Sequence, residues 1–235
     1  MREEDYRHYN DMFDEIHWLT VDTYSVVDTS DLNERKKRLK KAAENTLITA
    51  YLNGMTAAVH MINDLFMQAG VQKYFSPSVS EKDADKAVYE KIAGKDFAQR
   101  LDEYSSELGN DAEVERVLQT EAHRLFNTGL MDALILYELA DYGDLKSTED
   151  EGSEEKSPLI PDLPKTAVQK LKLGKQWRTM EDERVRDTHV YLDGVKAAAD
   201  ERFYTYDGDS ARFPGDFSTA QNNINCRCWI DIVRV

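Results

Sequence analysis

The fold is decided by one long stretch, residues 111–141, which reads DAEVERVLQTEAHRLFNTGLMDALILYELAD. Its apolar residues recur at steps of three and four, and this spacing predicts one amphipathic helix that is capped by Asp111. At 1.5 Å per residue, such a helix is about 45 Å long. Its expected core stripe consists of Val114, Val117, Leu118, Ala122, Leu125, Gly129, Ala133 and Leu136.

The residues upstream of this stretch also predict helices. A first amphipathic helix is expected over 6–27, and a second, longer one is expected over 39–69, where Gly70 stops it. Two shorter helices are expected over about 80–93 and 96–108. We expect the two long helices to pack together, because each has a continuous apolar face. The residues expected to be buried by this packing are Leu47, Ala50, Leu118 and Leu125.

The charge of the chain is unevenly distributed. The 235 residues have a formal net charge of −15, and residues 165–235 contain 12 Lys and Arg against 11 Asp and Glu, so residues 1–164 carry −16. This net negative charge argues against a protein that binds nucleic acid or an anionic membrane over its whole surface. No apolar run reaches the ~18–20 residues that span a bilayer, and the polar start MREEDYRHYNDMF is not expected to be a secretory signal. Two cysteines are too few for a disulfide scaffold.

A change of composition marks the expected domain boundary. Residues 141–156 contain seven Asp and Glu against two Lys, and three of the five prolines follow at positions 158, 161 and 164. Such composition is typical of a loop or a flexible insertion. We therefore expect a helical body over 1–142, an acidic, proline-containing linker or insertion over 143–164, and a small domain over 165–235.

The C-terminal third has a different periodicity. Partial two-residue alternation predicts a strand over about 168–177, and a short helix is expected over 181–192. Clean alternation from Cys226 to Ile232 predicts a final strand. The expected fold class is therefore α+β, with an elongated, mainly helical N-terminal body of long helices and a small α+β C-terminal domain.

Three clusters contain residues that could carry chemistry. On the long helix, Glu121 and Arg124 are three residues apart and can pair, and Asn127 lies one turn further on. This cluster is interpreted as a polar seam that docks the helix against the next domain. The alternative is a catalytic pair formed by Glu121 and His123.

The second cluster follows the basic stretch at Trp177. Asp182, Arg186 and His189 are spaced by four and three residues, so a helix would place them on one face. The side chains on such a face either hydrogen-bond to one another as a buried polar network or act as ligands for a bound group.

The third cluster is the cysteine pair Cys226 and Cys228. On a strand the two side chains point the same way, with Cα atoms about 7 Å apart, which makes a disulfide awkward. The two thiols and His189 offer three zinc-type ligands, and Asp187 or Asp182 is a candidate for the fourth. Because only one residue separates the cysteines, two buried structural cysteines are favoured over a metal.

Several of these motifs occur in a recognisable order. Residues Trp177 to Gly194 follow the pattern W-R-T-x-x-D-x-R-V-R-D-x-H-x-x-L-D-G, then P-G-D follows at 214–216 and N-C-R-C at 225–228. Upstream, residues 120–129 follow the pattern T-E-x-x-R-x-x-N-x-G. Together they resemble the phage Mu protein F-like head morphogenesis family, the minor head proteins of tailed phages. The resemblance runs from about residue 120 to residue 228 and is interrupted by the acidic segment.

The resemblance implies a structural, non-enzymatic role. A minor head (minor capsid) protein of a phage or prophage is expected to act in head morphogenesis at the portal vertex, and in genome packaging or delivery. Its expected location is the capsid interior of the virion at the portal vertex, after assembly in the host cytoplasm. The expected partners are the portal protein and other head proteins, with an oligomer or ring in the virion. Weak DNA contact and no membrane contact are expected.

The resemblance also bears on the metal. Many members of the family have a cysteine pair where this chain has Arg186 and His189, and there the pair and the C-x-C could form a four-ligand zinc site. Here only His189, Cys226 and Cys228 match, because an arginine cannot serve as a ligand. We therefore expect no cofactor in preference to zinc. In such a metal-free clasp, His189 bonds to a carboxylate or a backbone carbonyl and the thiols pack as apolar groups.

The same resemblance assigns a set of residues to a polar structural clasp. In it we expect Arg184 or Arg186 to pair with a nearby aspartate. The residues of the expected clasp are Glu121, Arg124, Asn127, Trp177, Asp182, Arg184, Arg186, Asp187, His189, Asp193, Gly194, Asn225, Cys226, Arg227 and Cys228.

An enzyme is the alternative hypothesis. Domains of this family are found joined to toxin domains, and a cluster of His, Asp and Cys side chains can support a metal- or histidine-dependent hydrolase or nuclease-type effector. The sequence contains no nucleophile elbow, phosphate loop or zincin motif, and this favours the structural role.

Overall fold

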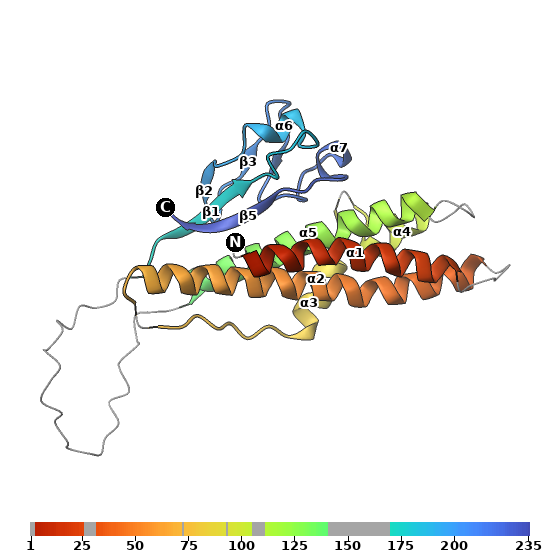
Figure 1. Cartoon of the computed structure of the whole chain (residues 1–235), viewed down its shortest axis with the longest axis horizontal. Helices are drawn as coiled ribbons and strands as arrows, with labels where there is room; N and C mark the ends of the chain where they lie inside the picture. Colours follow the sequence, from red (N-terminus) through yellow and green to blue (C-terminus); the bar gives the residue numbers. More distant parts are fainter. Residues whose placement is uncertain (1–2, 26–31, 72, 93, 105–110, 141–169) are drawn as a thin grey trace, which may run out of the picture.

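The computed structural model describes residues 3–25, 32–71, 73–92, 94–104, 111–140 and 170–235. The fold class is α+β, as predicted, with long helices in the N-terminal body and a small sheet in the C-terminal region (Figure 1). The acidic segment and the predicted linker boundaries lie outside the described residues. The helices are α1 (Glu3–Ser25), α2 (Leu32–Gln68), α3 (Glu81–Val88), α4 (Phe97–Tyr104), α5 (Asp111–Leu139), α6 (Asp187–Val190) and α7 (Ala220–Asn223).

The three long helices α1, α2 and α5 lie side by side and form the body (Figure 1). The predicted burial of the α2 and α5 stripes is confirmed, since Leu47, Leu118 and Leu125 have no exposed surface and Ala50 has almost none. Burial of each such leucine contributes about 1.5–3 kcal/mol to folding. One member of the expected stripe was wrong, since Leu136 is 38% exposed.

The helix predicted over about 80–93 ends earlier than the sequence predicts, whereas the predicted end of the next helix lies outside the described residues. The side chain of Ser80 caps α3 together with Asp83, which accepts a hydrogen bond from the Ser80 amide at 3.0 Å. The helix ends at Val88 rather than near residue 93, because the chain turns back through paired backbone hydrogen bonds between Ile92 and Lys95. Within the described residues, α4 extends only to Tyr104.

The C-terminal region contains a three-stranded antiparallel sheet in the order β2–β1–β5, in which β1 (Leu173–Arg178) is central. Its neighbours are β2 (Lys196–Ala198) and β5 (Trp229–Arg234), and Trp177 pairs with Ile230 in the register of β1 and β5. A separate hairpin pairs β3 (Phe203–Tyr204) with β4 (Ser210–Ala211). The sheet lies over the body, and β5 reaches α2, where the Ile232 amide donates to the Met61 sulfur at 3.4 Å.

The predicted helix over 181–192 was wrong in length. Only the single turn α6 is helical, because Glu181 adopts a positive φ of 53° and the side chain of Asp182 accepts a hydrogen bond from the Arg184 amide. These local bonds compete with helix formation, as is typical of aspartate in turns. Asp182 and His189 therefore do not share a helix face.

The predicted final strand starts later than expected. Ile230 and Ile232 are buried in β5 and alternate with partly exposed neighbours, but Cys226 and Cys228 lie before the strand. Asn225 adopts a left-handed φ of 56°, a conformation that asparagine tolerates better than most residues, and the Cys226 amide bonds back to the Asn223 carbonyl. The two cysteines are therefore not part of the final strand in which the sequence had placed them.

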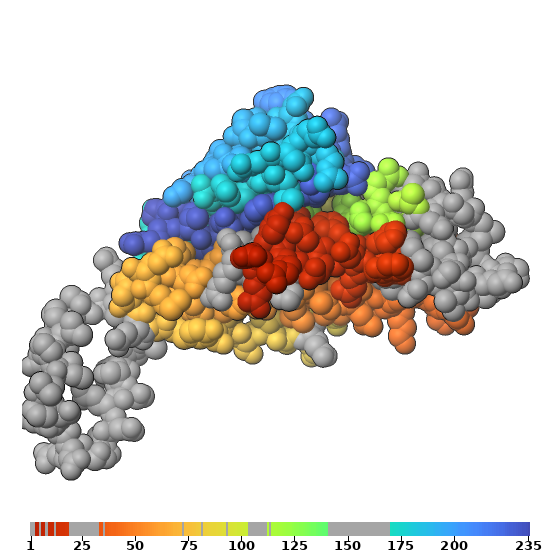
Figure 2. Space-filling model, viewed as in Figure 1, coloured from red at the N-terminus to blue at the C-terminus, as the bar shows by residue number. Residues whose placement is uncertain are grey.

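The two parts of the molecule pack against each other. Figure 2 shows the C-terminal region (cyan to blue) seated directly on the helical layer, in contact with α1 (red). The phenol of Tyr6 on α1 donates to the Met180 sulfur at 3.1 Å, and its ring lies 5.6 Å from that of Trp229. In the part of the chain that is described, no helix combines the length and the apolarity that crossing a bilayer requires.

Candidate functional site

The centre of α5 carries a buried ionic network. Arg100 donates to both carboxylate oxygens of Glu121, at 2.5 and 2.8 Å, and Arg124 donates to the same carboxylate at 3.1 Å. Burial alone would raise the pKa of Glu121, but the two guanidinium groups lower it below its ordinary value. The pairing of Glu121 with Arg124 that the sequence predicts is therefore present, and Arg100 adds a second cation.

The polar face of α5 contacts the C-terminal region at two points. Gly215 of the P-G-D motif lies directly on Arg124, so that a β-carbon on Gly215 would be 3.0 Å from the Arg124 Cα. One turn further on, Asn127 donates to the Cys228 carbonyl at 3.4 Å. This is the arrangement that a docking seam requires.

The alternative of a catalytic Glu–His pair finds no support in the contacts of this helix. The carboxylate of Glu121 is occupied by Arg100 and Arg124, whereas His123 Nδ1 lies 2.8 Å from the hydroxyl of Tyr9 on α1. The described contacts include no hydrogen bond between Glu121 and His123. His123 is instead part of a chain of buried polar groups that leads to the cysteines.

Three side chains form a buried thiol–imidazole cluster, which consists of His189, Cys226 and Cys228. The His189 Nδ1 atom lies 3.6 Å from the Cys226 sulfur and 3.6 Å from the Cys228 sulfur. The exposed fractions are 1% for His189, 4% for Cys226 and 3% for Cys228. The proximity of His189 to both cysteines, predicted from the motifs, is confirmed, while the role of the cluster stays a prediction.

Aromatic rings fix the orientation of the imidazole. The His189 ring is stacked on Phe217 at a centroid distance of 5.1 Å and meets the Trp177 ring edge-on at 5.5 Å. Trp177 comes from the central strand β1, and Phe217 follows the P-G-D motif. Two segments of the family-like pattern therefore build the walls of the cluster.

A chain of buried groups connects the cluster to the body. Burial alone would raise the pKa of the Cys226 thiol, but hydrogen bonds from Cys228, His123 and His189 lower it well below its ordinary value. The hydrogen bond with Cys226 and burial raise the pKa of the Cys228 thiol. Burial, followed by the nearby cysteines, raises the pKa of Tyr9. The two thiols therefore titrate as a coupled pair, in which a proton shared with Cys228 favours the Cys226 thiolate.

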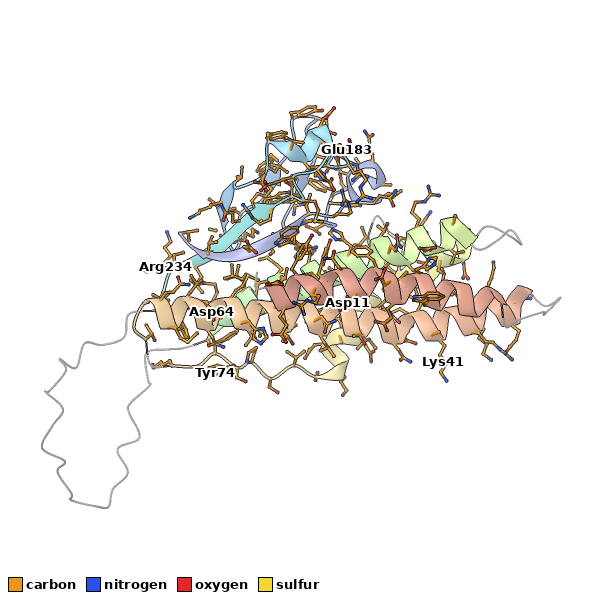
Figure 3. The ribbon with its side chains drawn as sticks, viewed as in Figure 1. Asp11, Lys41, Asp64, Tyr74, Glu183 and Arg234 are labelled. Carbon is orange, nitrogen blue, oxygen red and sulfur yellow. The ribbon has the colours of Figure 1, made fainter. Side chains whose placement is uncertain are left out.

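The turn before α6 is tied to the N-C-R-C segment by two arginines. Arg227 donates to the carboxylate of Asp182, which also lies 3.7 Å from Arg184. Arg186 donates to the Ile224 carbonyl rather than to an aspartate. The expected pairing of Arg184 with Asp182 is present. Figure 3 shows Glu183, in the same turn, on the outer side of the C-terminal region.

The remaining predicted clasp residues act at the end of β1. Asp193 accepts hydrogen bonds from the amide of Thr179 at 2.7 Å and from its hydroxyl at 3.2 Å, and Gly194 donates its amide to the Trp177 carbonyl at 2.8 Å. Asp187 is exposed at the start of α6 and belongs neither to the cluster nor to an aspartate–arginine pair among the described contacts. Its candidacy as a metal ligand is therefore not supported by the geometry.

The sequence did not predict the buried polar contacts of three residues, Tyr9, His123 and Asp209. Tyr9 sits in an ordinary apolar stripe and carries no local signal, while His123 was considered only as a partner of Glu121. Asp209 is buried and accepts hydrogen bonds from the hydroxyls and amides of Ser218 and Thr219. These bonds hold the pKa of Asp209 far below its ordinary value, despite burial. The Ser218–Thr219 pair directly before α7 is the sequence feature that could have indicated a buried carboxylate acceptor such as Asp209.

Comparisons with known proteins agree with the motif pattern. Residues 163–231 match the model of a family described as Phage Mu protein F like protein. The chain is also similar to the NAD(+)--arginine ADP-ribosyltransferase EFV of Enterococcus faecalis (strain ATCC 700802 / V583), with 29% identity over 153 residues. That match covers 58% of this chain but only 28% of the relative. No solved structure matches the chain significantly.

Proposed function

Because residues 163–231 match the family described as Phage Mu protein F like protein, we propose that this chain is a minor head protein of a tailed phage or prophage, which acts at the portal vertex during head morphogenesis. The observation that supports this role most strongly is the position of the family pattern. Its segments form the cluster walls, the N-C-R-C turn and the contact with α5. The residues that define the family therefore serve to build the domain and to dock it on the body.

The helical body is the part that engages the head. It consists of long helices, and residues 1–142 carry a net charge of −11, to which the acidic segment 143–164 adds −5. The partners proposed for it are the portal protein and other head proteins, in an oligomer or ring inside the capsid. Like charges oppose direct binding of the body to packaged DNA, so a role in genome packaging or delivery acts through protein contacts and, at most, weak local DNA contact.

An enzymatic function is the weaker proposal. The activity in the name of the Enterococcus faecalis relative belongs to a protein of which this chain spans less than a third. In the described part of the chain, the buried carboxylate of Glu121 is neutralised by two arginines, and the cluster histidine is enclosed by aromatic rings. These contacts favour a structural use of the residues over hydrolysis.

The experiment that tests the proposed function is an in-frame deletion in the phage genome that encodes the chain, followed by complementation. We expect the deletion to reduce infectious titre and the fraction of DNA-filled heads, and the wild-type gene supplied in trans to restore both. A gene that encodes Tyr204→Ala serves as the control and should restore the titre as the wild-type gene does. The Tyr204 side chain is 66% exposed and takes no part in the contacts of the seam described above. Unchanged titre and normal heads after deletion would contradict the proposal.

A further inference from the structure

We propose that His189, Cys226 and Cys228 bind one zinc ion, with a water molecule as the fourth ligand. The inference is independent of the phage role and depends on the geometry of the cluster. Its ligand atoms all lie within 4.8 Å of one another, and all three residues are buried. Two sulfurs and one imidazole nitrogen are the ligand types that zinc prefers, whereas magnesium and calcium prefer oxygen.

The distances in the cluster are those of a tetrahedral site. Zinc bonds of about 2.0–2.1 Å to nitrogen and about 2.3 Å to sulfur place N and S about 3.5–3.6 Å apart when the angle is tetrahedral. Both observed distances from His189 Nδ1 to a cysteine sulfur are 3.6 Å. A neutral ring nitrogen has one proton or one lone pair, and so forms one well-aligned hydrogen bond. Two equal contacts are better explained by an ion that all three atoms share.

The cluster also has room for a fourth ligand. A void of about 10 Å³ adjoins it, which is close to the minimum that one water molecule needs. The residues that line the void are Arg184, Val185, Arg186, His189, Asn225, Cys226, Arg227 and Cys228.

Within the described residues, the hydrogen-bonding contacts of the His189 ring are confined to Nδ1. The other ring nitrogen of His189, Nε2, is buried and has no hydrogen-bond partner in the described part of the chain. The metal-free clasp predicted a bond from His189 to a carboxylate or a backbone carbonyl, and neither is among its described contacts. The polar interactions of this imidazole are therefore concentrated at Nδ1, where the two sulfurs lie.

The surroundings are suited to a thiolate-bound dication. Two thiolates balance the charge of Zn²⁺, which removes the cost of burying an uncompensated charge. The nearest cations are engaged elsewhere, since Arg227 bonds to Asp182 and Arg186 bonds to the Ile224 carbonyl. His123 lies next to this site on α5, where its Nδ1 is 2.8 Å from the Tyr9 hydroxyl and its Nε2 is 3.5 Å from the Asn127 amide nitrogen.

The ion would connect segments that are distant in sequence. His189 belongs to α6 and the cysteines precede β5, so the ion closes a loop of about 40 residues within the C-terminal region. Asn127 on α5, which donates to the Cys228 carbonyl at 3.4 Å, extends the connection to the body. Zinc would therefore stabilise the C-terminal domain and its docking on α5 together.

The test measures metal content in full-length protein purified without chelators. Plasma mass spectrometry should find about one zinc per chain, and less than about 0.1 in His189→Ala and Cys228→Ser. His17→Ala is the matched control, because His17 is a half-exposed residue on α1 that should leave the zinc content unchanged. The wild type saturated with Co²⁺ should show thiolate-to-cobalt absorption in the near ultraviolet, and Cys228→Ser should lose it.

A second measurement covers the case in which the variants fail to fold. In the wild type, a chelator such as dipicolinate should lower the Tm by at least about 10 °C and make both thiols reactive towards Ellman's reagent. Added zinc should reverse both effects. Absence of zinc from the purified protein, together with a Tm and thiol reactivity that neither chelator nor added zinc changes, would overturn the proposal.

Discussion

Gly54 of α2 and Gly129 of α5 face each other where the two long helices cross. A β-carbon on Gly129 would lie 3.2 Å from the carbonyl carbon of Gly54 and 2.2 Å from the carbonyl oxygen of Tyr51. A β-carbon on Gly54 would lie 1.9 Å from the carbonyl oxygen of Phe126. The two backbones are therefore in direct contact, and no larger residue fits at either position without separating the helices.

We expect Gly129→Ala to destabilise the protein despite the higher helix propensity of alanine. The added methyl group meets backbone atoms, which cannot rotate away as a side chain can, so the cost should reach at least about 3 kcal/mol. Chemical denaturation of the purified protein measures this change. The control is Thr56→Ala on the exposed face of α2, for which a change of less than about 0.5 kcal/mol is expected. A Gly129→Ala variant with the same free energy of unfolding as the wild type would contradict the direct contact between the two backbones.

The ionic network on α5 gives a second prediction. Glu121→Gln removes the charge that compensates Arg100 and Arg124, so it should cost about 3–5 kcal/mol of unfolding free energy. Glu3→Gln is the matched control, since the Glu3–Arg7 pair is exposed and should contribute nothing measurable. Equal stability of the two variants in urea would contradict the assignment of a buried network.

Lys175 gives a prediction of pH dependence. Its side chain is buried in β1, its ammonium donates to the Ala199 carbonyl at 3.0 Å, and burial lowers its pKa to about 8. Between pH 8 and the ordinary lysine pKa, the unfolded chain binds more protons than the folded chain, so stability rises with pH.

The measurement compares Lys175→Met with the wild type at several pH values. The stability of the wild type relative to Lys175→Met should rise by about 2–3 kcal/mol from pH 8 to pH 10. Lys196→Met removes the same charge from an exposed position and serves as the control. A difference between wild type and Lys175→Met that stays constant over this range would contradict the lowered pKa.

The helical body was predictable from sequence because apolar periodicity determines it. The spacing of Leu118, Leu125 and their neighbours gave α5 and its buried face. The ends of the short elements were not predictable in the same way, because they depend on single local bonds. The Asp182 side chain shortens the predicted helix before α6, and the left-handed Asn225 delays β5. Neither effect produces a periodic signal.

The candidate site was predictable in part. The order of the motifs indicated that His189 lies near Cys226 and Cys228, and the spacing on α5 indicated the pair Glu121–Arg124. The contribution of Tyr9 was not predictable, because it reaches the site only through the packing of α1 on α5. The partner of Arg186 was missed because a backbone carbonyl leaves no trace in sequence.

The charge distribution predicts weak DNA binding. The net charge of −11 on residues 1–142 opposes binding of the body to duplex DNA, and residues 165–235 carry a net charge of only +1. Any binding of the full-length chain should therefore be weak, local and strongly dependent on salt. Fluorescence anisotropy with a labelled duplex at several salt concentrations measures it. Tight binding at physiological salt that persists after deletion of residues 165–235 would contradict this account.

The central claim, a structural role in the phage head, is tested most directly by the protein composition of purified heads. Quantitative mass spectrometry of density-purified, DNA-filled heads should find this chain at a low, fixed ratio to the portal protein. Protease treatment of intact heads should leave it undigested, because its proposed location is inside the capsid. Absence of the chain from purified heads, with all of it recovered in the soluble fraction of the lysate, would contradict the claim.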